Sequence, residues 1–248
     1  MLGQREALLQ SVFISVDGLG YMMFGLGEQA YPADETTDAI TAVIASQQAP
    51  DGSWTAGIPV VRPPIEDSAV VRTALAVRTL ATYPIAARKL ELDERVASAR
   101  RWLLELKPEL PHDRSFQLLG LKWAGAEPKA IERVASEVRR LQRPDGGWAQ
   151  IRQLPSDAYA TGVALYALRQ AGESSQSAVY RRGVRYLMAS QRNDGSWYLP
   201  SRAPKLQPYF QSGFPYDHDQ WISAAATAWS VAALSEAIEP PRKSASRF

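Results

Sequence analysis

The chain has 248 residues and no cysteine, which excludes disulfide bonds, thiol nucleophiles and cysteine-ligated zinc or haem. Its 46% hydrophobic and 22% charged residues are ordinary for a globular protein, and a formal net charge of +2 gives little support to a nucleic-acid partner. No apolar run approaches the roughly 20 residues of a membrane-spanning helix. The first residues lack the apolar core of a signal peptide, so we expect a cytoplasmic or membrane-peripheral protein. Peripheral membrane contact and the oligomeric state stay open.

Two kinds of helical segment alternate along the chain. Amphipathic segments that carry Arg and Glu are expected to form an outer, solvent-facing layer, and Ala-rich segments with few polar residues an inner layer. In chain order, the predicted pairs of outer and inner helices lie near 2–11 and 16–29, 35–47 and 66–82, 93–106 and 113–125, 128–142 and 156–171, and 176–190 and 219–236. The pattern predicts an all-α fold of about five helical hairpins.

Three segments share a pattern in which Gln precedes Trp by six residues, with Asp-Gly at the turn between them. They are Gln48–Trp54, Gln142–Trp148 and Gln191–Trp197. The interval between the first two is close to twice the interval between the last two, which predicts a degenerate unit where Lys107–Pro111 replaces the turn. Such self-similarity is typical of one supersecondary unit used repeatedly, so we expect a single domain over residues 1–248.

With these repeats and two helical layers, the sequence resembles the squalene–hopene cyclase and prenyltransferase-β superfamily of α/α-toroid proteins over essentially its whole length. The resemblance implies a toroid whose inner helices surround an apolar centre that binds an isoprenoid chain. It also implies that the Gln of each repeat ties its outer helix to the next inner helix while the Trp packs over it. A structural role is therefore expected for the three Trp residues, whose indoles suit an enclosed site.

Cyclases of this superfamily start catalysis with an acid in a D-x-D-D-T-A motif at the head of an inner helix. The stretch Asp217-His218-Asp219-Gln220 heads the last inner helix and keeps the first two acids, with Gln in place of the final one. Alkene protonation needs a carboxylic acid whose anion is stabilised as it forms, so Asp219 is the candidate proton donor, tuned by Asp217 and His218. The alternative is that Asp219 caps the helix.

A second stretch resembles the same motif at the head of the second inner helix. Glu66 and Asp67 keep its last two acids, but Pro64 stands at the first, and Asp67 has the same capping alternative. Prenyltransferases of the superfamily hold zinc through Asp, Cys and His, and this chain has no Cys. Two carboxylates and an imidazole within Asp217–Asp219 do not converge easily from one turn, so no metal and no other cofactor is predicted.

The longest interruption of the helical pattern is a proline-rich and aromatic loop, 198–216, that leads into Asp217. Loops of this length in compact domains are usually functional, and the aromatic content argues against disorder. Its rings could stabilise carbocations or bind an apolar chain. The candidate ligand-binding residues are Tyr209, Phe210, Phe214, Tyr216 and Trp221, together with Asp157 and Tyr159, which either line the cavity or cap the fourth inner helix.

Two functions are compatible with these observations. The first is a terpene-cyclase-like protein that binds an apolar isoprenoid chain in a central cavity and can start its cyclisation with an acid. The second is a non-catalytic α/α-toroid domain that binds a ligand or a protein partner. The aromatic loop favours the first, and the incomplete acid motif favours the second.

Overall fold

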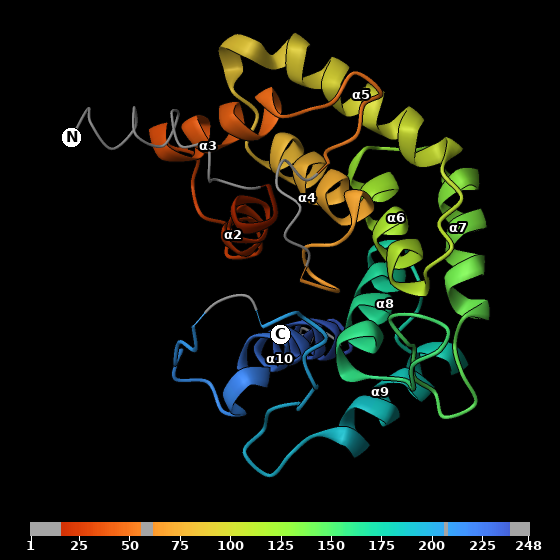
Figure 1. The fold of residues 1–248 in the computed structure, drawn as a ribbon. Helices are drawn as coiled ribbons and strands as arrows, with labels where there is room; N and C mark the ends of the chain where they lie inside the picture. The colour runs from red at the N-terminus through yellow and green to blue at the C-terminus, as the bar shows by residue number, and fades with distance from the viewer. Residues whose placement is uncertain (1–15, 56–61, 206–207, 239–248) are drawn as a thin grey trace, which may run out of the picture. The chain divides into compact units, whose positions relative to one another are not determined.

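The computed structural model describes residues 16–55, 62–205 and 208–238 (Figure 1). The helix predicted near 2–11 lies outside them. Over these ranges the structure is helical without any strand, which confirms the all-α class. The α-helices are α2 (Val16–Glu28), α3 (Glu35–Ser46), α4 (Ala69–Thr82), α5 (Lys89–Glu105), α6 (Pro111–Trp123), α7 (Pro128–Arg140), α8 (Ala158–Gln170), α9 (Ala178–Ser190) and α10 (Gln220–Ser235). Short 3₁₀ turns, η1 (Ala86–Arg88) and η2 (Asp217–Asp219), precede α5 and α10.

The chain divides into two compact units, with residues 1–137 and 202–206 in unit 1 and residues 138–201 and 207–248 in unit 2. In unit 1, α2, α4 and α6 lie side by side as an inner layer, and α3 and α5 pack on its outer side (Figure 1). In unit 2, α8 packs along α10, and α9 lies against both. Each unit therefore shows the alternation of outer and inner helices that an α/α toroid uses. The single domain over residues 1–248 stays a prediction.

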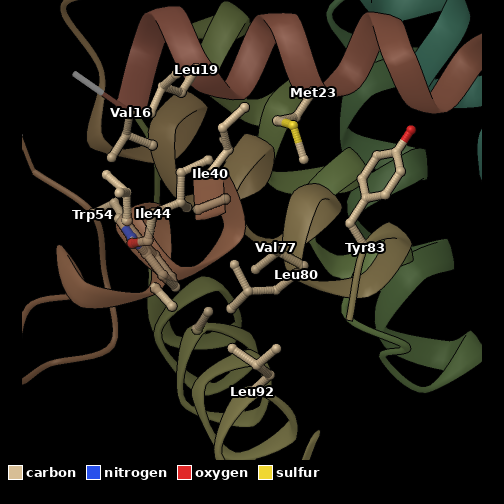
Figure 2. Close-up of a cluster of buried hydrophobic side chains, with 14 of the residues drawn as sticks. Val16, Leu19, Met23, Ile40, Ile44, Trp54, Val77, Leu80, Tyr83 and Leu92 are labelled. Carbon is tan, nitrogen blue, oxygen red and sulfur yellow. The ribbon is translucent and has the colours of Figure 1, made fainter. Parts of the chain in front are cut away.

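The core of unit 1 shows why these segments form two layers (Figure 2). Apolar residues of α2, α3, α4 and α5 converge on one cluster that includes the indole of Trp54, which is fully buried. Its members include Val16, Leu19, Met23, Ile40, Ile44, Val77, Leu80, Tyr83 and Leu92. Burial of such side chains contributes about 1.5–3 kcal/mol each, so this cluster holds the outer helices on the inner ones.

Close approach of the inner helices depends on small residues, as the pair α8 and α10 shows. A Cβ atom built on Gly162 of α8 would lie 2.6 Å from the carbonyl carbon of Trp229 in α10. Any larger residue would therefore separate the two helices. One turn along α8, the ring of Tyr166 meets that of Trp229 edge-on, with centroids 5.4 Å apart.

The three Asp-Gly-containing segments have the same hydrogen bonds around their Trp residues. Each indole N–H donates to a main-chain carbonyl in the last turns of the preceding outer helix, and each Trp amide donates to a Thr hydroxyl on the following inner helix. For Trp54, Trp148 and Trp197 the carbonyls are those of Ile44, Val138 and Leu187, at 2.7, 2.8 and 2.8 Å, and the hydroxyls are those of Thr73, Thr161 and Thr227, at 3.0, 2.9 and 3.0 Å. Trp thus links the outer helix to the next inner helix.

The Gln residues make a different link from the one expected. The side-chain amide of Gln48 donates to the carbonyl of Gly52 at 3.0 Å and to the carbonyl of Arg95 in the next outer helix, α5, at 2.9 Å. Gln142 repeats this with Gly146 and with Val179 of α9, at 2.9 and 2.8 Å. The expectation that Gln reaches the inner helix was wrong. One amide hydrogen closes the turn, and the other bonds the main chain of the next outer helix.

The degenerate unit replaces this link with a residue of the inner helix. Gln117 of α6 is fully buried, and its amide donates to the carbonyls of Leu103 and Leu106 at the end of α5, at 2.6 and 3.0 Å. Carbonyls at the end of a helix have no amide donor within that helix. Gln117 therefore holds α5 on α6 where the chain has no Asp-Gly turn.

Candidate functional site

Within unit 2, the last part of the aromatic loop is held at the head of α10 by Gln220, the residue that stands in place of the last acid of the cyclase motif. Gln220 is 1% exposed. Its amide donates to the carbonyl of Phe210 at 2.8 Å, and its carbonyl oxygen accepts from the amide of Ser212 at 2.6 Å. Sequence reasoning assigned Gln220 no role, although an amide that satisfies two main-chain groups suits a buried loop anchor.

The carboxylate of Asp219 holds the beginning of the loop instead of capping α10. One oxygen accepts from the phenol of Tyr198 at 2.8 Å, and the other from the amide of Ser201 at 2.8 Å. No side-chain cap bond forms at this helix start, so the capping alternative was wrong for Asp219. The bond to Asp219 raises the pKa of Tyr198, because the neighbouring carboxylate favours the protonated phenol. The role of Asp219 as a proton donor stays a prediction.

Asp217 and His218 both lie close to Tyr209. The ring of His218 meets that of Tyr209 edge-on, with centroids 5.0 Å apart. Desolvation, followed by a hydrogen bond with Asp217, raises the pKa of the Tyr209 phenol. Tyr209 and His218 thus form an aromatic pair at η2, and both residues are exposed to solvent. The predicted tuning of Asp219 by these two neighbours stays a prediction.

Phe210 and Trp221 form a stacked pair that is exposed to solvent. The rings of Phe210 and Trp221 are 6.2 Å apart with an angle of 17° between their planes, and they are 68% and 56% exposed. The structure thus brings together, at the head of α10, the loop aromatics and the two acids of the stretch Asp217–Asp219.

Tyr216 lies at a strained point between the loop and η2. Its φ is 84°, and that of the following Asp217 is 51°. Residues other than glycine rarely adopt this left-handed conformation. The Tyr216 hydroxyl shares a hydrogen bond of 2.6 Å with Ser196 in the third Asp-Gly turn. Its ring packs edge-on against Phe214, with centroids 6.4 Å apart. Backbone strain of this kind often accompanies functional sites.

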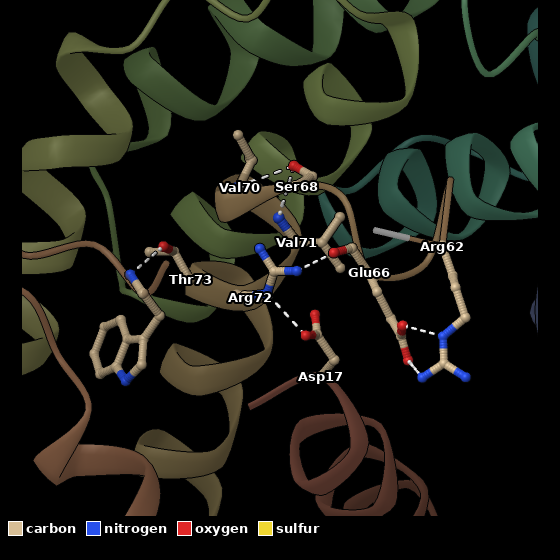
Figure 3. A network of polar contacts seen from close by, with 9 residues as sticks. Asp17, Arg62, Glu66, Ser68, Val70, Val71, Arg72 and Thr73 are labelled. Atoms are coloured by element: carbon tan, nitrogen blue, oxygen red, sulfur yellow. Dashed lines mark hydrogen bonds and ion pairs between the residues drawn. The ribbon is translucent and has the colours of Figure 1, made fainter. Parts of the chain in front are cut away.

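Glu66 and Asp67 belong to unit 1, where Ser68, not Asp67, caps α4 (Figure 3). The Ser68 hydroxyl accepts from the amides of Val70 and Val71, at 3.1 and 3.4 Å, so the capping alternative was wrong for Asp67. Asp67 is exposed. The carboxylate of Glu66 is held by Arg62, with Nη2 and Oε1 2.7 Å apart.

A buried ion pair beside Glu66 was not predicted from the sequence (Figure 3). Arg72 of α4 donates to Asp17 of α2 at 2.8 Å and also to the carbonyl of Glu66, and Arg72 and Asp17 are 4% and 5% exposed. Burial raises the pKa of Asp17, while its hydrogen bond and ion pair with Arg72 act in the opposite direction. This ion pair joins the inner helices α2 and α4 next to Glu66.

Asp157 and Tyr159 start α8 in unit 2. The side chain of Asp157 accepts from the amide of Ala160 at 2.8 Å, which confirms its capping role. The side chain of Tyr159 is fully buried. Their role in ligand binding stays a prediction.

Among the described residues, no group of three or more His, Asp or Glu side chains is arranged to hold a metal ion. None of the helices in this part of the chain combines the length and apolar character needed to cross a bilayer.

The family model of the squalene-hopene cyclase C-terminal domain matches residues 116–218. The match runs from α6 through the aromatic loop and ends within η2. A lanosterol synthase of Aspergillus fumigatus is 30% identical over 115 residues, and a squalene–hopene cyclase of Bradyrhizobium diazoefficiens is 34% identical over 111 residues. Over this part of the sequence, the family model and both relatives support a resemblance to the terpene cyclase superfamily.

The chain spans only a small part of the length of these two enzymes. The alignments cover 46% and 40% of this chain, but 14% and 16% of the lanosterol synthase and the squalene–hopene cyclase. A solved structure from Salmonella enterica, described as a possible member of the GH105 family, is similar with a TM-score of 0.52 and 12% identity. The alignment covers 92% of this chain and 72% of the Salmonella chain. At this identity, the similarity concerns the fold alone.

Proposed function

We propose that this terpene cyclase relative binds an apolar isoprenoid chain at the head of α10. The observation that carries the proposal is the exposed stack of Phe210 on Trp221, which Gln220 holds in place through its bond to the Phe210 carbonyl. An anchored aromatic pair loses little conformational entropy on binding, and its faces suit both an alkyl chain and a developing cation.

Binding is tested with squalene and shorter prenyl compounds presented in detergent micelles, with affinity measured by calorimetry. The variant that combines Phe210→Ala with Trp221→Ala should bind about thirtyfold more weakly, since each exposed ring contributes on the order of 1 kcal/mol and the two together about 2 kcal/mol. Met188→Ala is the matched control, because Met188 is a similarly exposed apolar residue on α9, at 57%. Equal affinities of the double variant and the wild type would contradict the proposed binding site.

We further propose that Asp219 starts cyclisation of the bound chain by protonating an alkene. The supporting geometry is the pair of donors on its carboxylate, the phenol of Tyr198 and the amide of Ser201, both at 2.8 Å. After proton transfer these donors would stabilise the carboxylate that remains, which is the task assigned to His218 on the sequence alone. The proton leaves Asp219 for one alkene carbon, and the other becomes a carbocation, which the aromatic rings would stabilise by cation–π contact.

A non-catalytic binding domain is the second candidate function. The observation that favours it is Gln220, which occupies the place of the last acid of the motif and is fully engaged as a loop anchor. Product formation from squalene by wild type and by Asp219→Asn separates the two functions, because Asn keeps the shape of the side chain but has no transferable proton. Loss of product in the variant, with ligand affinity unchanged, supports the cyclase. Binding without any product in the wild type supports the binding domain.

A further inference from the structure

The third Asp-Gly turn differs from the other two in the residue that follows its Trp, and this residue connects the turn with the head of α10. Thr55 and Ala149 follow the Trp of the first two turns, whereas Tyr198 follows Trp197. The Tyr198 phenol donates to Oδ2 of Asp219 at 2.8 Å, although the two residues are 21 positions apart in the sequence. The turn therefore supplies a donor to the acid of the proposed site.

The ring of Tyr198 has one partner in the turn and one in the aromatic loop. The guanidinium carbon of Arg192 lies 5.6 Å from the centroid of the Tyr198 ring, within the range of a cation–π contact. The ring of Tyr216 meets the Tyr198 ring edge-on, with centroids 5.1 Å apart. These contacts restrict the orientation of the phenol that donates to Asp219.

Tyr216 is itself held by the turn, through Ser196. The hydroxyl oxygens of Tyr216 and Ser196 are 2.6 Å apart. The Ser196 hydroxyl also lies 2.6 Å from Oδ1 of Asp194, and the Tyr216 hydroxyl lies 3.4 Å from Oδ2 of the same carboxylate. Ser196 is 6% exposed, so water competes little for its hydroxyl. The turn therefore reaches Tyr198 by a second route, through Tyr216.

The first turn has the same serine without this connection. Ser53 bonds to Oδ1 of Asp51 through its amide and its hydroxyl, at 2.9 and 2.8 Å, as Ser196 does with Asp194 at 3.0 and 2.6 Å. Among the described residues, the hydroxyl of Ser53 has no further side-chain partner. A change at Ser53 therefore measures the local cost of losing the bond within the turn, separately from any effect on the site.

We propose that the third turn positions the phenol that donates to Asp219, with Arg192 and Ser196 as positioning residues. The consequence for catalysis rests on the proposed role of Asp219 as a proton donor. The phenol of Tyr198 stabilises the carboxylate left after proton transfer only while it points at this oxygen. Arg192 and Tyr216 hold the ring in that orientation, and the positive charge of Arg192 makes the phenol a stronger donor.

The first test follows the Tyr198 phenol in the full chain by NMR of tyrosine isotopically labelled at Cζ, with Tyr198→Phe to assign the signal. The hydrogen bond to Asp219 raises the pKa of Tyr198, and the charge of Arg192 acts in the opposite direction. Ser196→Ala should therefore move the pKa of Tyr198 back toward its ordinary value, whereas Arg192→Gln should raise it further. Ser53→Ala is the matched control and should leave the signal unchanged. The Cζ chemical shift at neutral pH reports the same bond without an alkaline titration.

The second test measures kcat and KM with squalene. Gln220 holds the Phe210 main chain independently of the turn, so binding of the apolar chain should not depend on Ser196. Ser196→Ala should therefore lower kcat about tenfold and leave KM unchanged, because a donor to the developing carboxylate is misplaced. Tyr216→Phe keeps the ring and removes the hydroxyl, and it should have the same effect.

The two tests distinguish this inference from the proposed cyclisation. A Tyr198 signal that is the same in wild type, Ser196→Ala and Arg192→Gln overturns the positioning role, whatever the activity. An equal loss of kcat in Ser53→Ala also overturns it, since the effect would then be a general loss of stability. If the Tyr198 signal changes as expected but the wild type forms no product, the positioning role is supported and only the cyclisation is contradicted.

Discussion

Replacement of Trp148 by Ala should destabilise unit 2 strongly. The indole is 1% exposed and its N–H donates to the carbonyl of Val138 at 2.8 Å. Large-to-small changes of buried Trp cost about 3–5 kcal/mol in free energy of unfolding. Relaxation can fill little of the cavity that the indole would leave. Gly183 packs so closely on the indole that a Cβ built on it would lie 3.0 Å from the ring, and glycine has no side chain that could move into the cavity. We therefore expect a loss of about 4 kcal/mol.

Thermal unfolding followed by far-ultraviolet circular dichroism measures this loss. For a chain of this size, about 4 kcal/mol corresponds to a fall in Tm of about 8–16 °C. Trp221→Ala is the matched control, since Trp221 is 56% exposed in the same unit and its removal should change stability by about 0.5 kcal/mol or less. If Trp148→Ala does not fold, Trp148→Phe tests the same bond with a smaller loss. Equal Tm values for Trp148→Ala and Trp221→Ala would refute a structural role of the repeats.

Three further predictions concern single contacts. Ser68→Ala should cost about 1 kcal/mol in urea unfolding by removing the cap of α4, whereas Asp67→Asn should be nearly neutral. Gln117→Ala should cost about 1–3 kcal/mol in the same assay, because it leaves the carbonyls at the end of α5 without donors in a buried site. Burial raises the pKa of Tyr180 to about 12, so this residue stabilises the fold fully below pH 10 and progressively less as the pH rises toward 12. The unfolding free energy of Tyr180→Phe should therefore fall less steeply than that of wild type over this range.

Helix positions and layers were accessible from the sequence because they depend on local properties. Ala-rich segments predicted the enclosed helices, and α8 is buried over almost its whole length. The start of α4 was placed three residues early, since Asp67 and Ser68 are both good capping residues and only the three-dimensional arrangement decides between them.

The polar contacts between distant segments were not accessible in the same way. Asp17 and Arg72 are 55 residues apart, and nothing in their neighbours marks them as a buried pair. Gln220 could be recognised as a departure from the acid motif, but its bonds to Phe210 and Ser212 depend on the path of the loop. Among the candidate site residues, the aromatic loop and the acids after it do gather at one place, whereas Glu66 and Asp67 belong to the other unit.

The Asp-Gly turns have a consequence for how such proteins diverge. Both the indole and the Gln amide bond to main-chain carbonyls of the neighbouring outer helices, and every helix offers such groups whatever its side chains are. A hairpin can therefore accumulate substitutions on most of its surface without losing its attachment. This explains why turns remain alike within one chain whose helices share little sequence, and why a new hairpin could be joined to an existing one by a single turn.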